Sequence, residues 1–465
     1  MRNAVILGGG ISGLSAAWKI SALKDFTVDL IEKEERVGGV SGYFDFYGLK
    51  LDYGAHKIYS VIPGIMDEFK DLGAGRLITV KKDHKIILRG RLLQYPVKLA
   101  DLLPVFKPWE IVAVGLSVLR TMATAPFIKN PVSYEDYCRS VFGGQIYNIV
   151  FKPLAEKTWG DPRSLSADIG RTRIPTKDIY DLILRVTGLK RESKDTNAEF
   201  MYYPRAGFYD ICEAMADKIT EKGGSVRLGK RPAGFALKNG RITSVVLDDK
   251  SNVPADVVIS SIPLEELFML AFPDGKAGPK DGCFVPMRHS VIVYLAVNRP
   301  KVLKNQWIFC ADKDVIFSRI SEQKLITGSI FPGDKTVISC DFTCDGNSPL
   351  WAKSDGEIAE LCVEGLVRLK MLKKRDVSGS AVARLPNFYP VYKIGYKRKL
   401  KALVEKINGI ENLITTGRLG LSSYLNIDHC LDMGMLIASG LEDGTKAADI
   451  NNMLLNKVLH YRIVD

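Results

Sequence analysis

Three glycines near the start of the chain have the spacing of a phosphate-binding loop. Gly8, Gly10 and Gly13 form a G-x-G-x-x-G pattern, and an acidic residue, Glu32, follows about twenty residues later. The first glycine permits a tight turn, the second lets the backbone approach a diphosphate, and the third lets a helix pack closely on a sheet. A carboxylate at the position of Glu32 accepts hydrogen bonds from an adenosine ribose. These residues predict a site for the ADP half of a dinucleotide.

The flanking sequence supplies the elements that such a loop needs. Residues Asn3 to Gly8 read as a short apolar strand, and the segment after the loop has apolar residues at helical spacing. A second apolar strand, TVDLIEK, leads to Glu32. A helix that begins at Ile11 and Ser12 would offer free N–H groups and a positive dipole to the phosphates. The sequence therefore predicts a Rossmann-type site.

A second glycine pair follows the acidic residue. Lys33 and Arg36 lead to Gly38 and Gly39, and this arrangement resembles the extension of the dinucleotide fingerprint in the FAD-dependent amine oxidase superfamily. The resemblance implies that these backbone groups approach the diphosphate of the cofactor. It also implies that the cofactor is FAD and that Lys33 and Arg36 belong to the same site.

The segment from Asn412 to Gly440 is expected to form a strand, a turn, a loop and a helix. Within it, GRLGLSSYLNID resembles the closing FAD motif G-R-L-A-E-Y-K-Y-Y-D-M-D of the UDP-galactopyranose mutases. The matching residues are Gly417, Arg418, Leu419, Tyr424 and Asp428. The resemblance places Gly417, Arg418 and Asp428 at the cofactor and Tyr424 among the catalytic residues.

Four of the departures from the mutase motif bear on the site. Ser422 and Leu425 replace tyrosines, Asn426 replaces an aspartate, and Ile427 replaces a methionine. The resemblance still assigns Asn426 and Ile427 to the cofactor site. The mutases use the tyrosine that Ser422 replaces on the diphosphate of their substrate. We therefore expect a glycosyl substrate other than UDP-galactopyranose.

A further match concerns the flavin ring. The segment GAHKIYS, Gly54 to Ser60, resembles the mutase segment G-P-H-I-F-H-T, which implies that Gly54 and His56 neighbour the flavin. Other stretches resemble mutase-like and protoporphyrinogen oxidase-like proteins found with polysaccharide genes. These stretches are Phe151 to Gly160, Ser166 to Pro175, Tyr202 to Ile211 and Arg384 to Tyr392.

The sequence shows no His-Asp-Ser grouping and no metal-ligand spacing, so the flavin would supply the reactive chemistry while side chains orient and polarise the substrate. Arginines suit a diphosphate because they form bidentate hydrogen bonds. The available arginines are Arg171, Arg173, Arg205 and Arg384, of which we favour the last two. The expected catalytic residues are His56, Arg205, Arg384 and Tyr424.

Three functions remain open at this point. In the first, which we favour, a reduced flavin attacks the anomeric carbon of a nucleotide- or lipid-linked sugar without net redox change, in glycan biosynthesis. In the second, oxidised FAD accepts a hydride from an amine, a porphyrinogen or a polyene. In the third, the protein is a flavin-stabilised scaffold of a glycan-assembly complex.

The expected fold class is α/β, with a Rossmann-type FAD-binding domain interleaved with a mixed-sheet substrate domain and a helical cap. The FAD-binding domain is expected to comprise residues 1–93, 200–282 and 381–465, with the cap at 94–199 and the strand-rich substrate domain at 283–380. Residues Gly223 to Pro263 read as a hairpin followed by a buried strand that returns to the Rossmann sheet.

Composition limits which classes of partner and which cellular location we expect. The formal net charge is +12, yet the basic residues are spread along the chain without a nucleic-acid-binding module, so we expect no nucleic acid. The eight cysteines include no C-x-x-C pair, which is typical of reduced, cytoplasmic thiols. The start of the chain lacks the pattern of a signal peptide. The oligomeric state stays open.

One stretch, Leu102 to Ile128, is more apolar than expected for a cytoplasmic protein. Charged residues and prolines break it, and its longest apolar run is too short to span a bilayer of about 30 Å. We expect a buried helix here. The alternative is a helix that contacts the inner face of the membrane peripherally.

Overall fold

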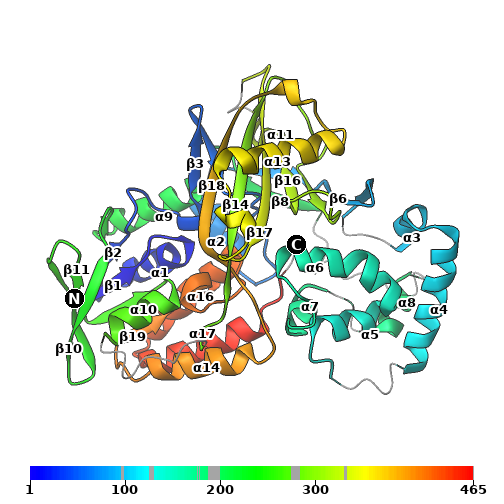
Figure 1. Cartoon of the computed structure of the whole chain (residues 1–465). Helices are drawn as coiled ribbons and strands as arrows, with labels where there is room; N and C mark the ends of the chain where they lie inside the picture. Colours follow the sequence, from blue (N-terminus) through cyan, green and yellow to red (C-terminus); the bar gives the residue numbers. More distant parts are fainter. Residues whose placement is uncertain are drawn as a thin grey trace.

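The computed structural model of the chain describes residues 1–95, 99–124, 130–174, 176, 178–186, 199–273, 283–328 and 332–463. Figure 1 shows an α/β part on the left, a strand-rich part at the top and a helical part on the right. The α/β class and the Rossmann-type domain predicted from the sequence are confirmed.

A five-stranded parallel sheet lies at the centre of the Rossmann-type domain. In spatial order its strands are β19 (Leu413–Thr415), β13 (Val257–Ser260), β1 (Arg2–Leu7), β2 (Phe26–Ile31) and β9 (Ser225–Arg227). Stretches that lie far apart in the chain thus form one sheet. The last four residues of β1 are all buried, as expected for a parallel strand with both faces covered.

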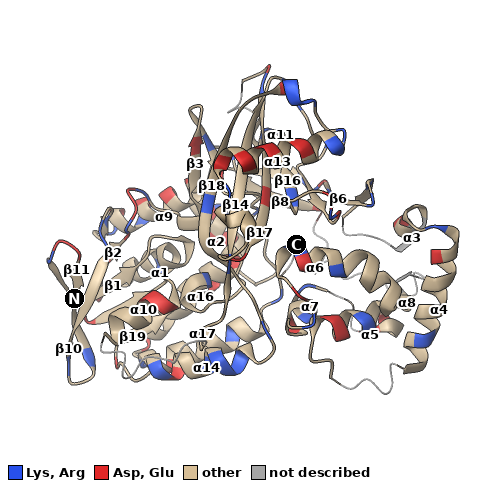
Figure 2. Cartoon of the chain, viewed as in Figure 1, with Lys and Arg blue, Asp and Glu red and all other residues tan. Residues whose placement is uncertain are grey.

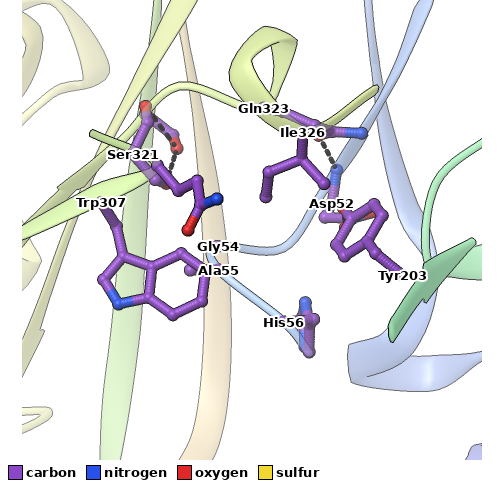
Figure 3. Close-up of a pocket in the computed structure, with 11 residues that line it drawn as sticks. Asp52, Gly54, Ala55, His56, Tyr203, Trp307, Ser321, Gln323 and Ile326 are labelled. Atoms are coloured by element: carbon purple, nitrogen blue, oxygen red, sulfur yellow. Dashed lines mark hydrogen bonds between the residues drawn. The ribbon is translucent and has the colours of Figure 1, made fainter. Parts of the chain in front are cut away.

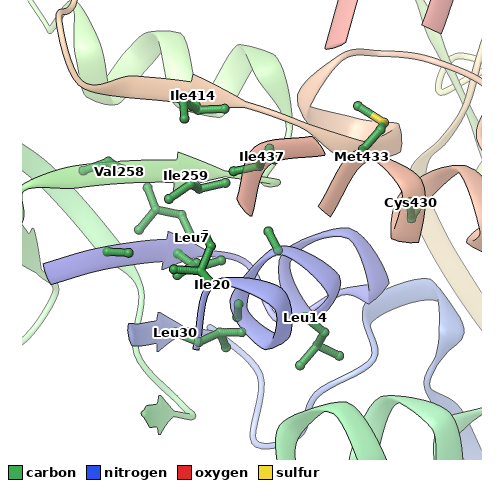
Figure 4. Close-up of a cluster of buried hydrophobic side chains, with 14 of the residues drawn as sticks. Leu7, Leu14, Ile20, Leu30, Val258, Ile259, Ile414, Cys430, Met433 and Ile437 are labelled. Carbon is green, nitrogen blue, oxygen red and sulfur yellow. The ribbon is translucent and has the colours of Figure 1, made fainter. Parts of the chain in front are cut away.

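Helices pack around this sheet and close its core. They are α1 (Ile11–Ser21), α9 (Tyr209–Glu221), α10 (Leu264–Ala271), α14 (Tyr396–Ile407), α16 (Ile427–Glu442) and α17 (Ala447–His460). Figure 4 shows Ile437 of α16 beside Ile259 of β13 and Ile20 of α1 beside Leu7 of β1, and Leu14 belongs to the same core. Helices α1 and α16 approach so closely that a Cβ atom at Gly434 would lie 2.7 Å from the carbonyl carbon of Ser15.

The middle of the chain leaves this sheet and returns to it. Strands β10 (Pro232–Lys238), β11 (Arg241–Leu247) and β12 (Asn252–Pro254) form an antiparallel sheet. Strand β13 then pairs in parallel with β1, with Ala4 opposite Val257. This path confirms the predicted hairpin and returning strand.

A seven-stranded mixed sheet forms the strand-rich part. In spatial order its strands are β18 (Val377–Pro390), β14 (Met287–Val297), β17 (Thr336–Cys344), β16 (Arg319–Ser321), β15 (Trp307–Cys310), β6 (His84–Leu88) and β7 (Arg91–Gln94). Helix α13 (Asp355–Arg368) packs on one face, where Val291 and Val293 of β14 belong to the shared core. Alternation sends Ile292 and Tyr294 to the opposite face.

The helical part follows the β6–β7 hairpin. Its helices are α3 (Leu99–Leu102), α4 (Pro108–Thr124), α5 (Tyr134–Ile146), α6 (Lys152–Thr158), α7 (Asp168–Arg173) and α8 (Ile179–Val186). The remaining α-helices and strands are α2 (Ile65–Leu72), α11 (Lys324–Thr327), α12 (Pro349–Ala352), α15 (Gly417–Gly420), the hairpin β3 (Tyr43–Phe46) with β4 (Leu49–Asp52), and β5 (Leu77–Lys81), which pairs with β8 (Phe200–Pro204). All eight cysteines are free thiols.

Helix α4 corrects one expectation. The apolar stretch was expected to form a buried helix, but Trp109, Val112, Leu116 and Leu119 of α4 are all exposed. The reason is its place at the outer edge of the helical part, where only one side meets other helices (Figure 1). In the described part of the chain, no helix has the length and apolar character needed to cross a membrane.

Candidate functional site

The glycine loop has the geometry of an anion-binding turn. Gly8 has a φ of +98°, and a Cβ atom at Gly13 would lie 1.9 Å from the carbonyl oxygen of Gly8. These two positions therefore require glycine. A Cβ atom at Gly10, in contrast, would have no described atom within 4 Å, so this side of the loop is open.

The N-terminus of α1 faces this opening without a side-chain cap. Gly10 occupies the N-cap position, and the first helical hydrogen bond is donated by Leu14 N–H to the Gly10 carbonyl, at 2.9 Å. The N–H groups of Ile11, Ser12 and Gly13 precede that ladder and are available to an anion. The loop and helix therefore offer a diphosphate site.

The second glycine pair packs against the first loop. The N–H of Gly38 donates to the carbonyl of Gly9 at 2.8 Å, and a Cβ atom at Gly39 would lie 3.3 Å from the Cα of Gly10. The close approach leaves no room for larger side chains between the two loops. The structure therefore brings all predicted glycines of the N-terminal region together.

Glu32 lies at the end of β2, beside this opening. Its carboxylate is buried and accepts hydrogen bonds from Gly9 N–H at 2.5 Å and from Glu34 N–H at 3.0 Å. Lys33 and Arg36 differ, because both lie at the surface, where Arg36 pairs with Asp45 at 3.2 Å. Glu32 is thus positioned for a ribose, while these two cations are not turned inward.

We expect the substitution Glu32→Gln to weaken FAD binding by about 1–3 kcal/mol, because a charged hydrogen-bond acceptor is lost. Titration of FAD-free protein with FAD, followed by flavin fluorescence, measures the change. Glu34→Gln is the matched control, since the Glu34 side chain is two-thirds exposed. Equal affinities in the two variants would remove Glu32 from the cofactor site.

The C-terminal motif closes over the same helix. Gly417 has a φ of +84°, and a Cβ atom there would lie 2.5 Å from the side chain of Ser12. Ser12 Oγ also donates to Cys430 Sγ of α16 at 3.1 Å. The Gly417-Arg418 turn and α16 are therefore fixed against the N-terminus of α1.

The N-terminus of α16 meets the loop that carries His56. Asn426 caps the helix with the side chain of His429, whose Nδ1 accepts from Asn426 N–H at 3.1 Å. Asp428 follows Ile427 in the first turn, and its carboxylate accepts from Ser60 Oγ at 2.8 Å. Its other oxygen is buried and has no hydrogen-bond partner among the described residues. This contact joins two of the predicted cofactor segments.

His56 is neutral in this environment. Burial lowers the pKa of His56 to about 3, and the charges of Arg319 and Arg418 act in the same direction. Its ring stacks on Phe208 with centroids 4.9 Å apart. A neutral imidazole can donate at one nitrogen and accept at the other.

Arg319 and Asp341 form an ion pair beneath the His56 loop. The guanidinium lies 2.7 Å from the carboxylate, and a Cβ atom at Gly54 would lie 3.0 Å from the guanidinium. Burial opposes the positive charge, but Asp341 raises the pKa of Arg319 above its ordinary value. Their chain neighbours Ile320 and Cys340 point to the α13 core. Because side chains alternate along a strand, Arg319 and Asp341 lie on the opposite face of the mixed sheet.

Arg418 lies within a group of aromatic rings. Its guanidinium is 5.0 Å from the ring centroid of Phe388 and 4.7 Å from those of Tyr389 and Tyr424. Its Nε and Nη2 atoms are buried and have no hydrogen-bond partner in the described ranges. Arg173 of α7 approaches Tyr424 at 4.0 Å. Two cations thus meet at one tyrosine.

The structure does not bring the two preferred arginines to this place. The guanidinium of Arg384 is 2.7 Å from the carbonyl of Trp351 and 2.9 Å from the carboxylate of Asp355, so it anchors α12 and α13. Arg205 is exposed in the turn after β8. Arg171 is also at the surface, 3.2 Å from Asp168. The positions of these three arginines in the sequence were compatible with a role at the site. In the folded chain, however, each of them lies beside other elements.

A small pocket lies beside the His56 loop. Its lining includes Asp52, His56, Tyr203, Trp307 and Gln323, which Figure 3 shows around the opening. The buried carboxylate of Asp52 accepts from the Tyr203 hydroxyl and, at 2.8 Å, from Phe208 N–H. The pocket therefore combines polar groups from the Rossmann-type domain and the mixed sheet.

Burial raises the pKa of Asp52 from 3.8 to about 7. The folded protein should therefore bind a proton at Asp52 that the unfolded chain lacks, so the contribution of Asp52 to the stability of FAD-free protein should grow as the pH falls from about 7 to about 4. We expect about 1.4 kcal/mol for each pH unit.

Thermal unfolding of wild type and Asp52→Asn across this range measures the effect. Buried neutral histidines such as His56 and His84 oppose it in both proteins, so the difference between the two proteins isolates Asp52. A difference that does not change with pH would contradict the raised pKa.

Comparisons with known proteins agree with this arrangement. The NAD(P)-binding Rossmann-like domain family matches residues 6–72. A 4,4'-diaponeurosporene oxygenase of Staphylococcus haemolyticus (strain JCSC1435) is 19% identical over 370 residues, which are 72% of this chain and 70% of that protein. A neurosporene-forming phytoene desaturase of Rhodobacter capsulatus is 23% identical over 284 residues, 56% of this chain and 52% of the desaturase.

Solved structures match over greater lengths. Reduced UDP-galactopyranose mutase superposes with a TM-score of 0.82 at 18% identity and covers 100% of both chains. The chain therefore has the fold of this mutase. A structure described as a protoporphyrinogen oxidase from Exiguobacterium sp. 255-15 has the same fold, with a TM-score of 0.75 at 17% identity over 96% of this chain and 99% of the other.

FAD is the cofactor that these residues fit. The open side of Gly10 and the uncapped α1 suit its diphosphate, Glu32 suits its ribose, and the Asp428 and Arg418 atoms without partners lie at the closing motif. Sequence reasoning missed Arg319, Asp341, Tyr389 and Asp52. A charged residue within an alternating apolar strand, as at Arg319 and Asp341, is the signal that could have found two of them.

Proposed function

We propose that this protein is an FAD-dependent enzyme that acts on a glycosyl substrate with a phosphate or diphosphate group. The observation that carries the proposal is the ring of Tyr424, which lies 4.0 Å from the guanidinium of Arg173 and 4.7 Å from that of Arg418. Two arginines at one aromatic platform suit a substrate with an anion and a flat or apolar group.

The neighbouring residues support a division of tasks. Flavin, when bound, would supply either a nucleophile for an anomeric carbon or an acceptor for a hydride. Arg173 and Arg418 would hold the anionic group with planar, bidentate donors. Neutral His56 would orient polar atoms beside the cofactor, and the aromatic rings would exclude water. Ser422 is buried with a φ of +43°, so its short hydroxyl cannot take the place of the mutase tyrosine.

The resemblance to the mutases and the full-length match to the mutase fold support sugar chemistry in glycan biosynthesis. The test is turnover of reduced protein on a panel of nucleotide- and lipid-linked sugars. Activity restricted to amines, porphyrinogens or polyenes under oxygen would overturn the proposal.

A pair of variants on one helix sharpens this test. We expect Arg173→Lys to raise the KM for a diphosphate sugar about 10- to 100-fold, because lysine keeps the charge but loses the bidentate fork. FAD retention should not change. Arg171→Lys is the matched control, since Arg171 contacts Asp168 and the carbonyl of Pro131 at the surface. Equal KM values in the two variants would contradict the role of Arg173.

A second candidate is oxidation of a polyene. The carotenoid enzymes that match the sequence favour it, as does the exposed apolar side of α4. Oxygen-dependent conversion of phytoene or a related polyene, without any effect of Arg173→Lys, would support this candidate.

A further inference from the structure

Helix α4 presents a continuous apolar stripe to solvent. Trp109, Val112, Leu116 and Leu119 recur at intervals of three and four residues and form what we call the α4 outer face. Each of their side chains is between 63% and 65% exposed. Figure 2 shows α4 at the right edge of the molecule as mostly uncharged ribbon. A stripe of this kind marks a site of interaction.

The opposite side of α4 already holds the helix in place. Val114, Val118 and Met122 pack on the core of the helical part, and Tyr180 of α8 donates to the Met122 carbonyl at 3.0 Å. The α4 outer face therefore contributes little to folding within the chain. No described residue buries its four large apolar side chains.

Cations surround the α4 outer face. Lys107 lies over the Trp109 ring at 5.0 Å, and Arg120 is exposed toward the other end of the helix. Arg89 and Arg91 belong to the neighbouring β6–β7 hairpin, where Arg89 binds the carboxylate of Glu110 at 2.7 Å. That ion pair neutralises the acidic residue of α4, so the border of the face is positive.

We propose that the α4 outer face docks onto the surface of an anionic lipid bilayer. A helix of 17 residues, about 25 Å long, would lie in the plane of the membrane with its apolar side chains among the acyl chains. Lys107 and Arg120 would then meet lipid phosphates, while the tryptophan would sit at the polar boundary.

The charges favour lipid over a second copy of this chain. In an antiparallel pairing of two α4 helices about a two-fold axis, Lys107 of one copy would approach Arg120 of the other. Like charges facing each other weaken such a contact, whereas anionic headgroups match both ends of the stripe. The proposal does not depend on the substrate of the flavin site.

Flotation of FAD-loaded protein with vesicles tests the proposal. Phosphatidylcholine vesicles are compared with vesicles that also contain phosphatidylglycerol, at low and high salt. We expect binding to the anionic vesicles at low salt and weaker binding at high salt, because salt screens surface charges over about 10 Å at 0.1 M. Leu116→Asp should reduce binding at least about 10-fold, since burial of one leucine is lost.

Met269→Asp in α10 is the matched control, because Met269 is also 64% exposed and lies on a helix outside this face. Its vesicle binding should equal that of wild type, and both variants should keep the wild-type unfolding temperature. Failure of wild type to float with anionic vesicles, or equal binding by Leu116→Asp, would overturn the proposal. A dimer in sedimentation that Leu116→Asp dissociates would instead identify a second copy as the partner.

Discussion

Replacement of Gly10 by alanine is expected to weaken FAD binding roughly 100-fold while FAD-free protein unfolds as before. The backbone at Gly10 has φ −73° and ψ 170°, which alanine adopts without strain, and a Cβ atom there meets no described atom within 4 Å. The protein itself therefore tolerates the methyl group. The diphosphate does not, because it must approach the backbone on that open side, and overpacking of this kind costs about 3 kcal/mol.

Two further variants make the result specific. Gly13→Ala should lower the unfolding temperature as well as FAD affinity, since its Cβ atom would lie 1.9 Å from the Gly8 carbonyl oxygen. Gly234→Ala, in β10, also meets no described atom and should change neither property. Fluorescence titration and thermal unfolding measure both quantities. Wild-type FAD affinity in Gly10→Ala would show that the diphosphate does not pass this side of the loop.

The substitution Arg418→Lys is expected to lower kcat about 100-fold, the usual effect of removing a preorganised donor from an active site. Lysine keeps one positive charge but loses the planar group that lies within 5.0 Å of the centroids of three aromatic rings. The Nε and Nη2 donors without partners would disappear as well.

Arg384→Lys provides the contrast, because its guanidinium is fully engaged with Trp351, Lys353 and Asp355. That variant should lose thermal stability but retain kcat per bound flavin. Steady-state turnover on the substrate found active, normalised to flavin content, measures kcat in both variants, and thermal unfolding measures their stability. A collapse of kcat in Arg384→Lys with normal turnover in Arg418→Lys would reverse the two assignments.

The cofactor half of the site could be predicted because its signals are local. Glycine at three close positions and a carboxylate after the second strand depend on backbone conformation within one strand–helix–strand unit. The closing motif at Gly417 was found through family resemblance. Its contact with Ser12 depends on packing between segments four hundred residues apart, which no spacing encodes.

The substrate half could be predicted less well, because it depends on which side chains meet in space. Arg384 was favoured for its place before Leu-Pro, yet strand alternation and α13 direct it to the outer side of the mixed sheet. Arg319 and Asp341 come from adjacent strands, and their pairing became visible only with the register of β16 against β17. The exposure of α4 likewise depended on which of its two apolar sides found a partner.

The order of strands in the Rossmann sheet bears on how this protein matures on the ribosome. Strand β1 emerges first, but its neighbour β13 begins at residue 257 and the edge strand β19 at residue 413. Until β13 has been synthesised, the nascent β1–β2 unit carries an unpaired, apolar edge at β1, which is a hazard for misassociation. Because α16 and the Gly417 turn complete the cofactor site, FAD capture must follow synthesis of nearly all described residues. Cells that produce the protein faster than chaperones can shield that edge should accumulate flavin-free aggregates.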